Sequence, residues 1–358
     1  MSKKYHITSF NLSLHKDMLD DFNKRIDRTG LRFDYNTHQL LKPGSKIFQE
    51  QIVLVEDEEY IRCVAKIKNQ NYLLKGKIIN FQDIQIPISE SIIDRKYLPS
   101  NLFFLKNLSN LSKNMHALGM GGVDEPLPKI LNKLGFDLFK VDFFFLPLKI
   151  STLYNIFINK ININLLKNFS FIFKPLDSII SLSYKLNCFK NRNIKIKIFE
   201  EFTEQDTLIW EAVKNDFHLI AEKKAENLNI IYSSERFKLT KLRIYDQEEY
   251  LGWLVLKITR HERDKYFADE KTCTIVDLCT EPCNYNIFIK TAKRIAFKDN
   301  AGVILMNSLN KEFNYFLKKN LFINSNSNFA FASKLENQHI DLNKSWITRG
   351  DGDGPINL

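Results

Sequence analysis

Residues 116–136 read HALGMGGVDEPLPKILNKLGF, and this stretch does most to decide the fold. Three of its glycines stand close together: Gly119, Gly121 and Gly122. Clustered glycines are typical of a tight turn, because they permit positive φ and let another group approach the backbone closely. The turn therefore serves either a bound group or only a sharp bend between a strand and a helix, and the sequence leaves both open.

The residues after this turn predict a short helix and an aromatic strand. Pro126 and Pro128 suit the first turn of a helix, which we expect over 127–134. Gly135 ends it, and apolar residues over 136–146 predict a strand.

The composition bounds the class of protein and of partner. The chain has 358 residues, of which 44% are hydrophobic, and this is enough for two domains with real cores. Its formal net charge of +10 suits a nucleic acid, a phosphorylated cofactor or an acidic membrane surface.

Cysteine usage and hydropathy predict a cytoplasmic protein. The five cysteines are odd in number, and their spacing is not that of a disulfide framework. The N-terminal residues lack the apolar run of a signal peptide, and no apolar stretch reaches the roughly 18–20 residues of a membrane span. Peripheral contact with the inner face of a membrane stays open.

Two halves of the chain show a similar order of predicted elements, which gives an α+β class with two mixed-sheet domains. In residues 1–150 we expect a helix over 15–26, a helix over 100–111, and strands over 5–10, 51–55, 60–67, 72–79 and 84–88. Residues 195–335 predict one or two helices within 202–228, helices over 287–299 and 311–319, and strands over 242–245, 250–259, 272–279, 303–306 and 328–332.

Residues 151–194 between the halves are predicted to form a basic helical linker. Over 149–199 there are nine Lys or Arg and a single acid, Asp177. Five lysines would fall within about 40° of one another on one helix, although Pro175 must interrupt it: Lys149, Lys160, Lys167, Lys174 and Lys185. This stripe is either the solvent-exposed face of a linker or a surface that binds anionic lipid.

The tail, residues 336–358, ends in SWITRGDGDGPINL. Its alternating glycines and aspartates predict a solvated loop rather than a metal site, because no full calcium-loop pattern follows Asp351 and Asp353.

The repeated plan resembles the GNAT superfamily of acyltransferases, and two copies in one chain are similar to its FemAB-like branch. Residues 132–136 (NKLGF) and 318–322 (KKNLF) resemble the turn that closes the family's fold. The combination of LGMGG, PLPK, LGF and a GDGDG tail also resembles tandem acyltransferase-like proteins of polysaccharide biosynthesis. The resemblance implies two GNAT-like domains, a degenerate one over 1–150 and a second over 195–335.

The resemblance also implies an acyl-CoA co-substrate, such as acetyl-CoA, whose pyrophosphate meets a helix N-terminus. The family's phosphate loop is rich in glycine, whereas residues 94–101 and 280–286 at the corresponding positions contain none. We expect Asn284, Tyr285 and Asn286 to bind the cofactor in the second copy, with Asn286 as the helix cap.

Acyl transfer to an amine needs a base, and three residues are candidates. Asp277 lies on the strand predicted over 272–279, Glu281 lies just beyond it, and His116 precedes the glycine turn. Each of them could instead be structural. Candidates for holding a sugar or phosphate are Gly121, Gly122, Arg236, Arg349, Asp351 and Asp353.

No metal is expected. Cys273, Cys279 and Cys283 lack the spacing of a zinc knuckle, and buried free thiols are the simpler interpretation. A cysteine nucleophile with His261 as its base is the remaining alternative.

These expectations converge on an N-acyltransferase that modifies an amino sugar or a lipid-linked saccharide precursor of surface polysaccharide. Two rivals remain. A FemAB-like transferase would take its group from aminoacyl-tRNA, which the positive charge suits. A non-catalytic, membrane-associated scaffold for polysaccharide assembly would explain the missing glycines.

Overall fold

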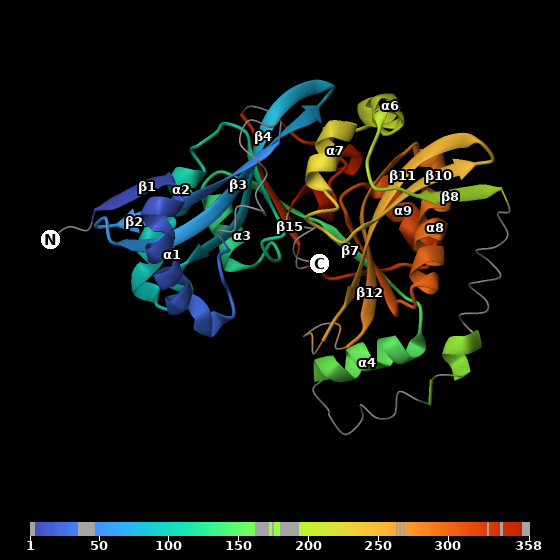
Figure 1. The fold of residues 1–358 in the computed structure, drawn as a ribbon, viewed down its shortest axis with the longest axis horizontal. Helices are drawn as coiled ribbons and strands as arrows, with labels where there is room; N and C mark the ends of the chain where they lie inside the picture. Colours follow the sequence, from blue (N-terminus) through green and yellow to red (C-terminus); the bar gives the residue numbers. More distant parts are fainter. Residues whose placement is uncertain are drawn as a thin grey trace. The chain divides into compact units, whose positions relative to one another are not determined.

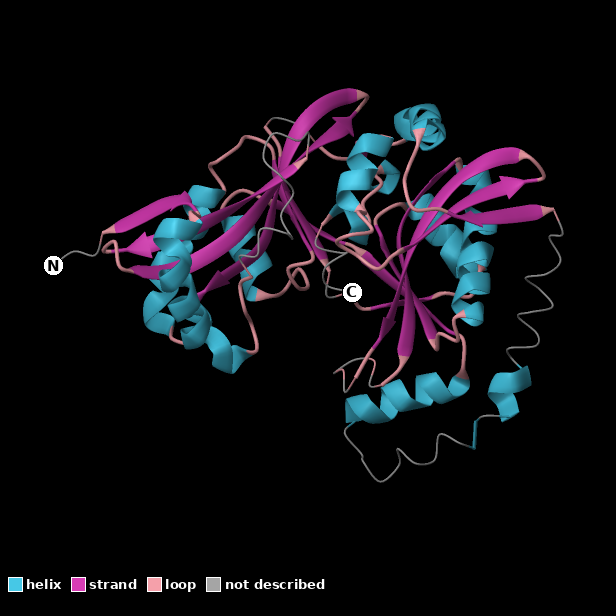
Figure 2. Cartoon of the chain, in the orientation of Figure 1, coloured by secondary structure: helices cyan, strands magenta, loops and turns pink. Residues whose placement is uncertain are grey.

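The computed structural model describes residues 4–34, 47–161, 172–173, 175–179, 193–262, 264, 267, 269–327, 329–336 and 339–352. The chain divides into two compact units, Met1–Lys140 with Asn328–Ile340 and Val141–Ser327 with Asp341–Leu358. Each unit combines helices with one mixed sheet, which confirms the predicted α+β class (Figure 1, Figure 2).

The sheet of the first unit has the strand order β1-β2-β3-β4-β5-β15-β6. Its strands are β1 (Tyr5–Ser9), β2 (Phe48–Glu56), β3 (Tyr60–Leu74), β4 (Lys77–Ser89), β5 (Met115–Leu118), β6 (Asp137–Lys140) and β15 (Ala330–Lys334). All neighbours are antiparallel except β4 and β5.

Helices cover both faces of this first sheet. Helix α1 (Leu12–Ile26) buries Leu19 and Phe22 against a cluster that includes Val53, whereas α2 (Leu98–Leu108) and α3 (Pro126–Lys133) pack against a cluster that includes Ile52. Because side chains alternate along a strand, these two clusters lie on opposite faces. Short 3₁₀ turns follow α1 and precede α2: Asp27–Thr29, Glu90–Ile92 and Arg95–Tyr97.

The sheet of the second unit has the order β14-β7-β13-β12-β11-β10-β8. Its strands are β7 (Asp142–Pro147), β8 (Ile194–Ile198), β10 (Thr240–Asp246), β11 (Glu249–Arg260), β12 (Lys271–Thr280), β13 (Val303–Ser308) and β14 (Ile323–Ser325). The other described elements of this unit are α4 (Ile150–Ile161), α6 (Glu204–Val213), β9 (Leu219–Ala221), α7 (Ala225–Ile231), α8 (Tyr285–Lys298), α9 (Lys311–Lys319) and the 3₁₀ turns Lys214–Asp216, Pro282–Asn284, Leu342–Lys344 and Arg349–Asp351.

The two sheets contain equivalent strands drawn from distant parts of the chain. Strand β15 lies between β5 and β6, as β7 lies between β13 and β14. The strand predicted over 136–146 is broken at Val141, so β6 joins the first sheet and β7 joins the second. The units are therefore discontinuous in sequence, whereas the expected domains, 1–150 and 195–335, were continuous.

Strand β3 runs through a break that the sequence predicted. Polar residues over 68–71 separate the expected strands 60–67 and 72–79, but the structure pairs this whole stretch with β4. The hairpin turns instead at Lys75 and Gly76, whose φ angles are 51° and 75°. Tertiary burial of both strand faces outweighs the polar pattern.

Most of the predicted lysine stripe cannot be compared with the structure. Lys167, Lys174 and Lys185 lie outside the described residues, as does the side chain of Lys160. The Nζ of Lys149 donates to Oδ1 of Asn300 at 2.7 Å. Among the described residues, no helix is long and apolar enough to cross a membrane.

Candidate functional site

The parallel strands β12 and β13 of the second unit separate part-way along their length. Their pairing runs from Thr272 with Val303 to Ile275 with Met306 and then stops, although both strands continue. Val255 and Leu256 are neighbours on β11, but they pair with Asp277 and Ile275, which are two positions apart on β12. Strand β12 therefore carries one extra residue at this point. Such a bulge increases the local twist and re-aims the side chains that follow it.

Residues 346–351 pack at the point where these strands separate. Thr348 forms an antiparallel bridge with Ser308 of β13. The half-buried Arg349 donates from Nε to Oδ1 of Asn307 at 2.5 Å, and burial of its guanidinium lowers the pKa of this group to about 10. The tail, residues 336–358, was expected to be solvated, and for Ser345–Gly352 that expectation is wrong, because most of these residues are buried.

Asp277 is the centre of the network that holds this segment. Its Oδ2 accepts from the hydroxyl of Tyr232 at 3.0 Å. Its Oδ1 accepts from Nε1 of Trp346 at 3.1 Å and from Oγ1 of Thr348 at 3.3 Å. Lys223 forms a buried ion pair with the same carboxylate. With so many donors around it, Asp277 is placed to position residues 346–351 rather than to accept a proton from a substrate.

The charge of Lys223 is maintained by its acidic neighbours. Burial alone lowers the pKa of this ammonium group, but the charges of Asp277 and Asp351 and the hydrogen bond to Asp277 outweigh burial and raise it. Asp351 in turn accepts from the backbone N–H of Thr348 at 2.7 Å and closes a capping box. Asp277, Arg349 and Asp351 are thus brought together, whereas Asp353 lies outside the described residues.

The predicted cofactor residues lie at the start of α8, but not as expected. The helix begins at Tyr285, and its N-cap is Asn284, which makes no side-chain cap hydrogen bond. Asn286 lies inside the helix, and its Oδ1 accepts from Asn320 at 2.9 Å, so the prediction that Asn286 caps the helix is wrong. Glu281 is exposed just before this helix.

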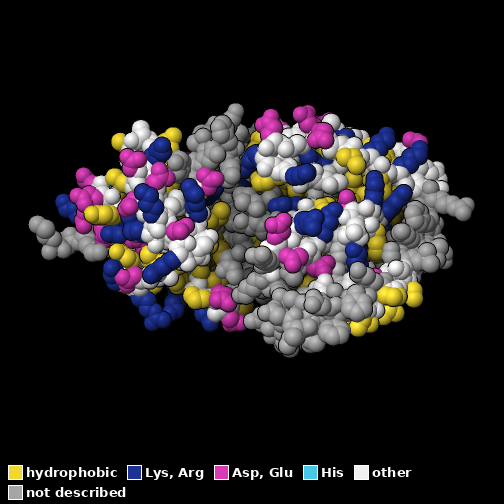
Figure 3. Space-filling view, turned by 60° about the horizontal axis from the view of Figure 1, so that its bottom comes forward, with side chains coloured by type: hydrophobic (Ala, Val, Ile, Leu, Met, Phe, Trp, Pro, Cys, Tyr) yellow, Lys and Arg dark blue, Asp and Glu magenta, His cyan; other side chains and the backbone are white. Residues whose placement is uncertain are grey.

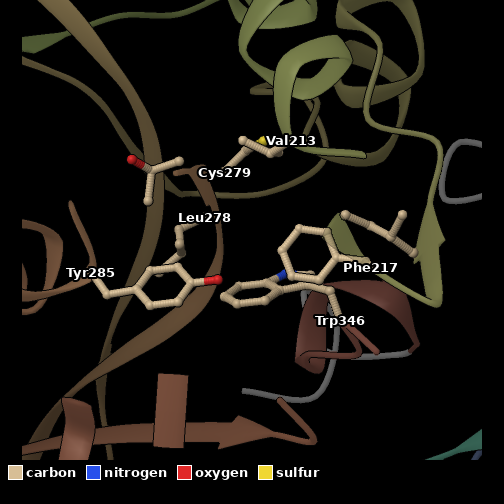
Figure 4. A pocket seen from close by; sticks show the side chains of 8 residues that line it. Val213, Phe217, Leu278, Cys279, Tyr285 and Trp346 are labelled. Atoms are coloured by element: carbon tan, nitrogen blue, oxygen red, sulfur yellow. The ribbon is translucent and has the colours of Figure 1, made fainter. Parts of the chain in front are cut away.

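The ring of Tyr285 points into a small cavity, which Figure 4 shows from close by. It stacks on Trp346 with centroids 5.8 Å apart. The cavity offers about 10 Å³ of space to the centre of a water molecule. This is about the space that one water needs. Its lining residues are Val213, Phe217, Ile220, Leu278, Cys279, Thr280, Tyr285 and Trp346.

The cysteines and His261 do not form a reactive or metal-binding cluster in the described part of the chain. Cys273 and Cys279 are buried, and burial raises the pKa of both thiols. Cys283 is exposed, and His261 places Nε2 3.1 Å from Oγ1 of Thr272. Across the described residues, no three His, Cys, Asp or Glu side chains are grouped so as to hold a metal ion.

The parallel strands β4 and β5 of the first unit separate in the same way. They pair only through Gln82 with Met115 and Asp83 with His116. Strand β4 then bulges, with Ile86 at a φ of 47° and Pro87 beside it. Although β4 is an inner strand, the bulge explains how proline is tolerated there.

His116 lies at the point where these two strands separate. It is fully buried among the rings of Tyr72, Phe81 and Phe331. Its Nδ1 is 3.5 Å from Oδ1 of Asp83, and neither ring nitrogen makes a hydrogen bond within the described structure. Burial, with a smaller effect of the charge on Lys68, lowers the pKa of His116 well below its usual range. The ring is therefore neutral at pH 7.

A row of buried polar side chains continues from His116 across the same face of the sheet. Gln85 donates to Oδ2 of Asp83 at 2.7 Å, and Gln49 donates to Oε1 of Gln85 at 2.6 Å. Lys68 lies 3.6 Å from the Asp83 carboxylate. Sequence reasoning missed this row.

The glycine turn after β5 accommodates the segment that enters β15. A Cβ on Gly119 would lie 2.7 Å from the ring of Phe329, and Gly121 accepts a backbone hydrogen bond of 2.9 Å from Ala330. Both glycines have positive φ. Close approach of a group is thus the correct explanation of the cluster, but the group belongs to the chain itself. Gly122 follows, half-buried.

Neither helix that follows a separated strand begins with a basic, glycine-rich loop. Before α2, the buried Glu90 forms ion pairs with Arg25 and Arg62. Before α8, Glu281 precedes a 3₁₀ turn. The predicted ligand Arg236 donates to the carbonyl of Ile230 at 3.3 Å.

The chain was compared with known proteins. No protein-family model matches it, and no curated protein matches it. Solved structures do match. Saccharomyces cerevisiae N-myristoyltransferase with bound myristoyl-CoA aligns at a TM-score of 0.53 and 10% identity, over 96% of this chain and 88% of that one. A GCN5-related N-acetyltransferase from Anabaena variabilis aligns at a TM-score of 0.55 and 9% identity, over 92% of this chain and 72% of that one.

The chain has the GNAT fold. These identities are low, so the likeness concerns the fold, and it confirms the predicted architecture of two mixed-sheet modules. The FemAB-like arrangement and the link to polysaccharide stay predictions.

Proposed function

We propose that this protein is an N-acyltransferase that moves an acyl group from acyl-CoA to a primary amine. The observation that carries the proposal is the separated, bulged parallel strand pair, which occurs in both units. A second support is the fold shared with an N-myristoyltransferase whose structure contains myristoyl-CoA.

The first unit is the better place for the reaction, which revises the expectation that the second copy holds the donor. In the second unit, residues 276–280 and 307–310 are buried, and the chain's own residues 346–351 pack there. In the first unit, Ile86 and Pro87 are only half-buried, and Gly119 is exposed. An acyl thioester could therefore reach the separation of β4 and β5 with less rearrangement.

His116 is the base that this arrangement favours. A neutral imidazole can accept the proton that the amine loses as its nitrogen attacks the thioester carbonyl. The carbon–sulfur bond then breaks, an amide forms, and coenzyme A leaves as a thiolate that takes up a proton. Asp83, 3.5 Å from Nδ1, is placed to orient the ring.

The acceptor class is a finer proposal. The amide-rich row of Gln49 and Gln85 beside His116 offers donors and acceptors of the kind that sugar hydroxyls need. This suits an amino sugar or a lipid-linked saccharide better than tRNA. Figure 3 also shows basic side chains interspersed with acidic ones on the face drawn, rather than gathered in one patch for a nucleic acid.

Binding and product formation test the proposal together. Calorimetry with acetyl-CoA, myristoyl-CoA and free coenzyme A should show micromolar binding of at least one acyl-CoA. Mass spectrometry after incubation with glucosamine should then show the N-acyl product. Binding without any product from an amine panel would favour the scaffold, and transfer only from aminoacyl-tRNA would favour the FemAB-like rival. Absence of binding to every acyl-CoA would refute the proposal.

A further inference from the structure

Helix α4 of the second unit buries Thr152 and Ile158 but presents two large apolar side chains to solvent. Thr152 and Asn155 donate to the two carboxylate oxygens of Glu270, each at 2.8 Å. On its outer side, Leu153 and Phe157 are 42% and 59% exposed. These two residues are four apart and therefore lie on one side of the helix. A surface helix ordinarily carries polar side chains on its outer side.

A second described segment is joined to α4 and is also apolar on its outside. Asp177 accepts from the backbone N–H of Ile150 at 2.5 Å and of Ser151 at 3.1 Å, and so caps the start of α4. The ring of Phe173 lies 5.0 Å from that of Tyr154. Figure 1 shows the short helical piece, 175–179, beside the start of α4.

Together these segments form a surface that we call the α4 patch. Its exposed members are Leu153, Phe157, Ile172, Leu176 and Ile179, the last three being 54%, 45% and 64% exposed. Exposed apolar residues gathered in this way mark an interaction site more often than singly scattered ones do.

The charge of this region indicates what covers the patch. Residues 149–199 contain nine Lys or Arg and one acid, Asp177. That acid is occupied by the α4 N-terminus and by the hydroxyl of Ser151. A protein surface needs no particular sign of charge, whereas the cytoplasmic face of a bilayer is anionic and attracts basic segments that lie beside apolar anchors.

We propose that the α4 patch binds the surface of an anionic lipid bilayer, with Leu153, Phe157 and Leu176 entering the interface. The proposal is independent of the acyltransferase assignment, since it involves neither His116 nor the separated strands. It also explains why Leu153 and Phe157 are left outside, whereas Thr152 and Asn155 contact Glu270.

Co-sedimentation of the full chain with vesicles tests this. Vesicles of phosphatidylcholine with phosphatidylglycerol are compared with vesicles of phosphatidylcholine alone. We expect binding to the anionic vesicles that weakens as salt rises. Phe157→Asp and Leu176→Asp should each lower the partition coefficient at least about tenfold, because an apolar anchor is replaced by a charge.

Leu208→Asp on α6 is the matched control, because Leu208 is 61% exposed. It should bind as the wild type does, and all variants should keep the wild-type melting temperature. Equal binding to both kinds of vesicle, or an equal loss in Leu208→Asp, would overturn the proposal. A failure to bind either kind of vesicle would also overturn the proposal. If ultracentrifugation then shows a dimer that Phe157→Asp abolishes, the α4 patch is a contact between two copies of the chain instead.

Discussion

The indole Nε1 of Trp346 donates a hydrogen bond of 3.1 Å to Oδ1 of Asp277, a strand residue 69 positions earlier. Both side chains are buried. This contact makes the segment around Trp346 a part of the second unit's core. It also explains why a carboxylate on the separated strand is better suited to hold the chain than to act on a substrate.

Removing the Asp277 carboxylate should destabilise the second unit strongly. Asp277→Ala leaves the ammonium group of Lys223 buried without its ion-pair partner. We expect the free energy of unfolding to fall by about 3–5 kcal/mol, measured by denaturant titration. Glu281→Gln, at an exposed position of the same region, should change it by less than about 0.5 kcal/mol. A loss below about 1 kcal/mol for Asp277→Ala would contradict this account.

The packing of residues 346–351 predicts a rescue at Gly350. A Cβ at this position would lie 2.1 Å from the hydroxyl oxygen of Tyr232. Gly350→Ala should therefore destabilise the protein, by about 1–3 kcal/mol as in other overpacked cores. Tyr232→Phe removes the clashing oxygen, so the double variant should be more stable than the sum of the two single changes. Strict additivity would show that the segment is not held as described.

The neutral state of His116 predicts an acid-dependent loss of stability. Its pKa in the folded protein lies well below 6.5, so below about pH 6.5 the unfolded chain binds a proton that the folded chain does not. Stability should therefore fall as the pH falls below about 6.5, by up to about 1.4 kcal/mol per pH unit from this group.

Comparison with His116→Gln isolates the contribution of this histidine. Denaturant titrations between pH 7 and pH 5 should give a shallower loss for the variant, while other histidines, such as His15 and His261, contribute equally to both proteins. Identical slopes would mean that His116 is protonated in the folded state, against the environment described.

Local patterns predicted most individual elements. Helix α1 and helix α9 follow apolar spacing, and α9 begins and ends at the residues expected. The parallel pairing of β4 with β5 and of β12 with β13 was not predicted, whereas the α+β class with two mixed-sheet domains followed from the order of elements. Such features depend on residues near one another in sequence, where periodicity carries information.

Features that depend on distant residues could not be predicted. Nothing in residues 137–147 tells which sheet each part joins, because both parts have the same aromatic character. The partners of Asp277 are Lys223, Tyr232 and Trp346. No pattern in the sequence links these three residues to one another or to Asp277. Polar residues over 68–71 predict a break between two strands, because a buried polar strand has the same composition as a loop until its partners are known.

The rate of coenzyme A release tests the central claim most directly. Thiol release from an acyl-CoA should require an amine acceptor. His116→Gln should lower kcat by about 10²–10⁴-fold, the usual contribution of a general base, while Glu281→Gln keeps the wild-type rate. The exposed thiol of Cys283 would also be counted in a thiol assay. It is therefore blocked beforehand, or its signal is subtracted as background. Amine-dependent release that survives His116→Gln but is lost in Glu281→Gln would contradict the placement of the reaction in the first unit.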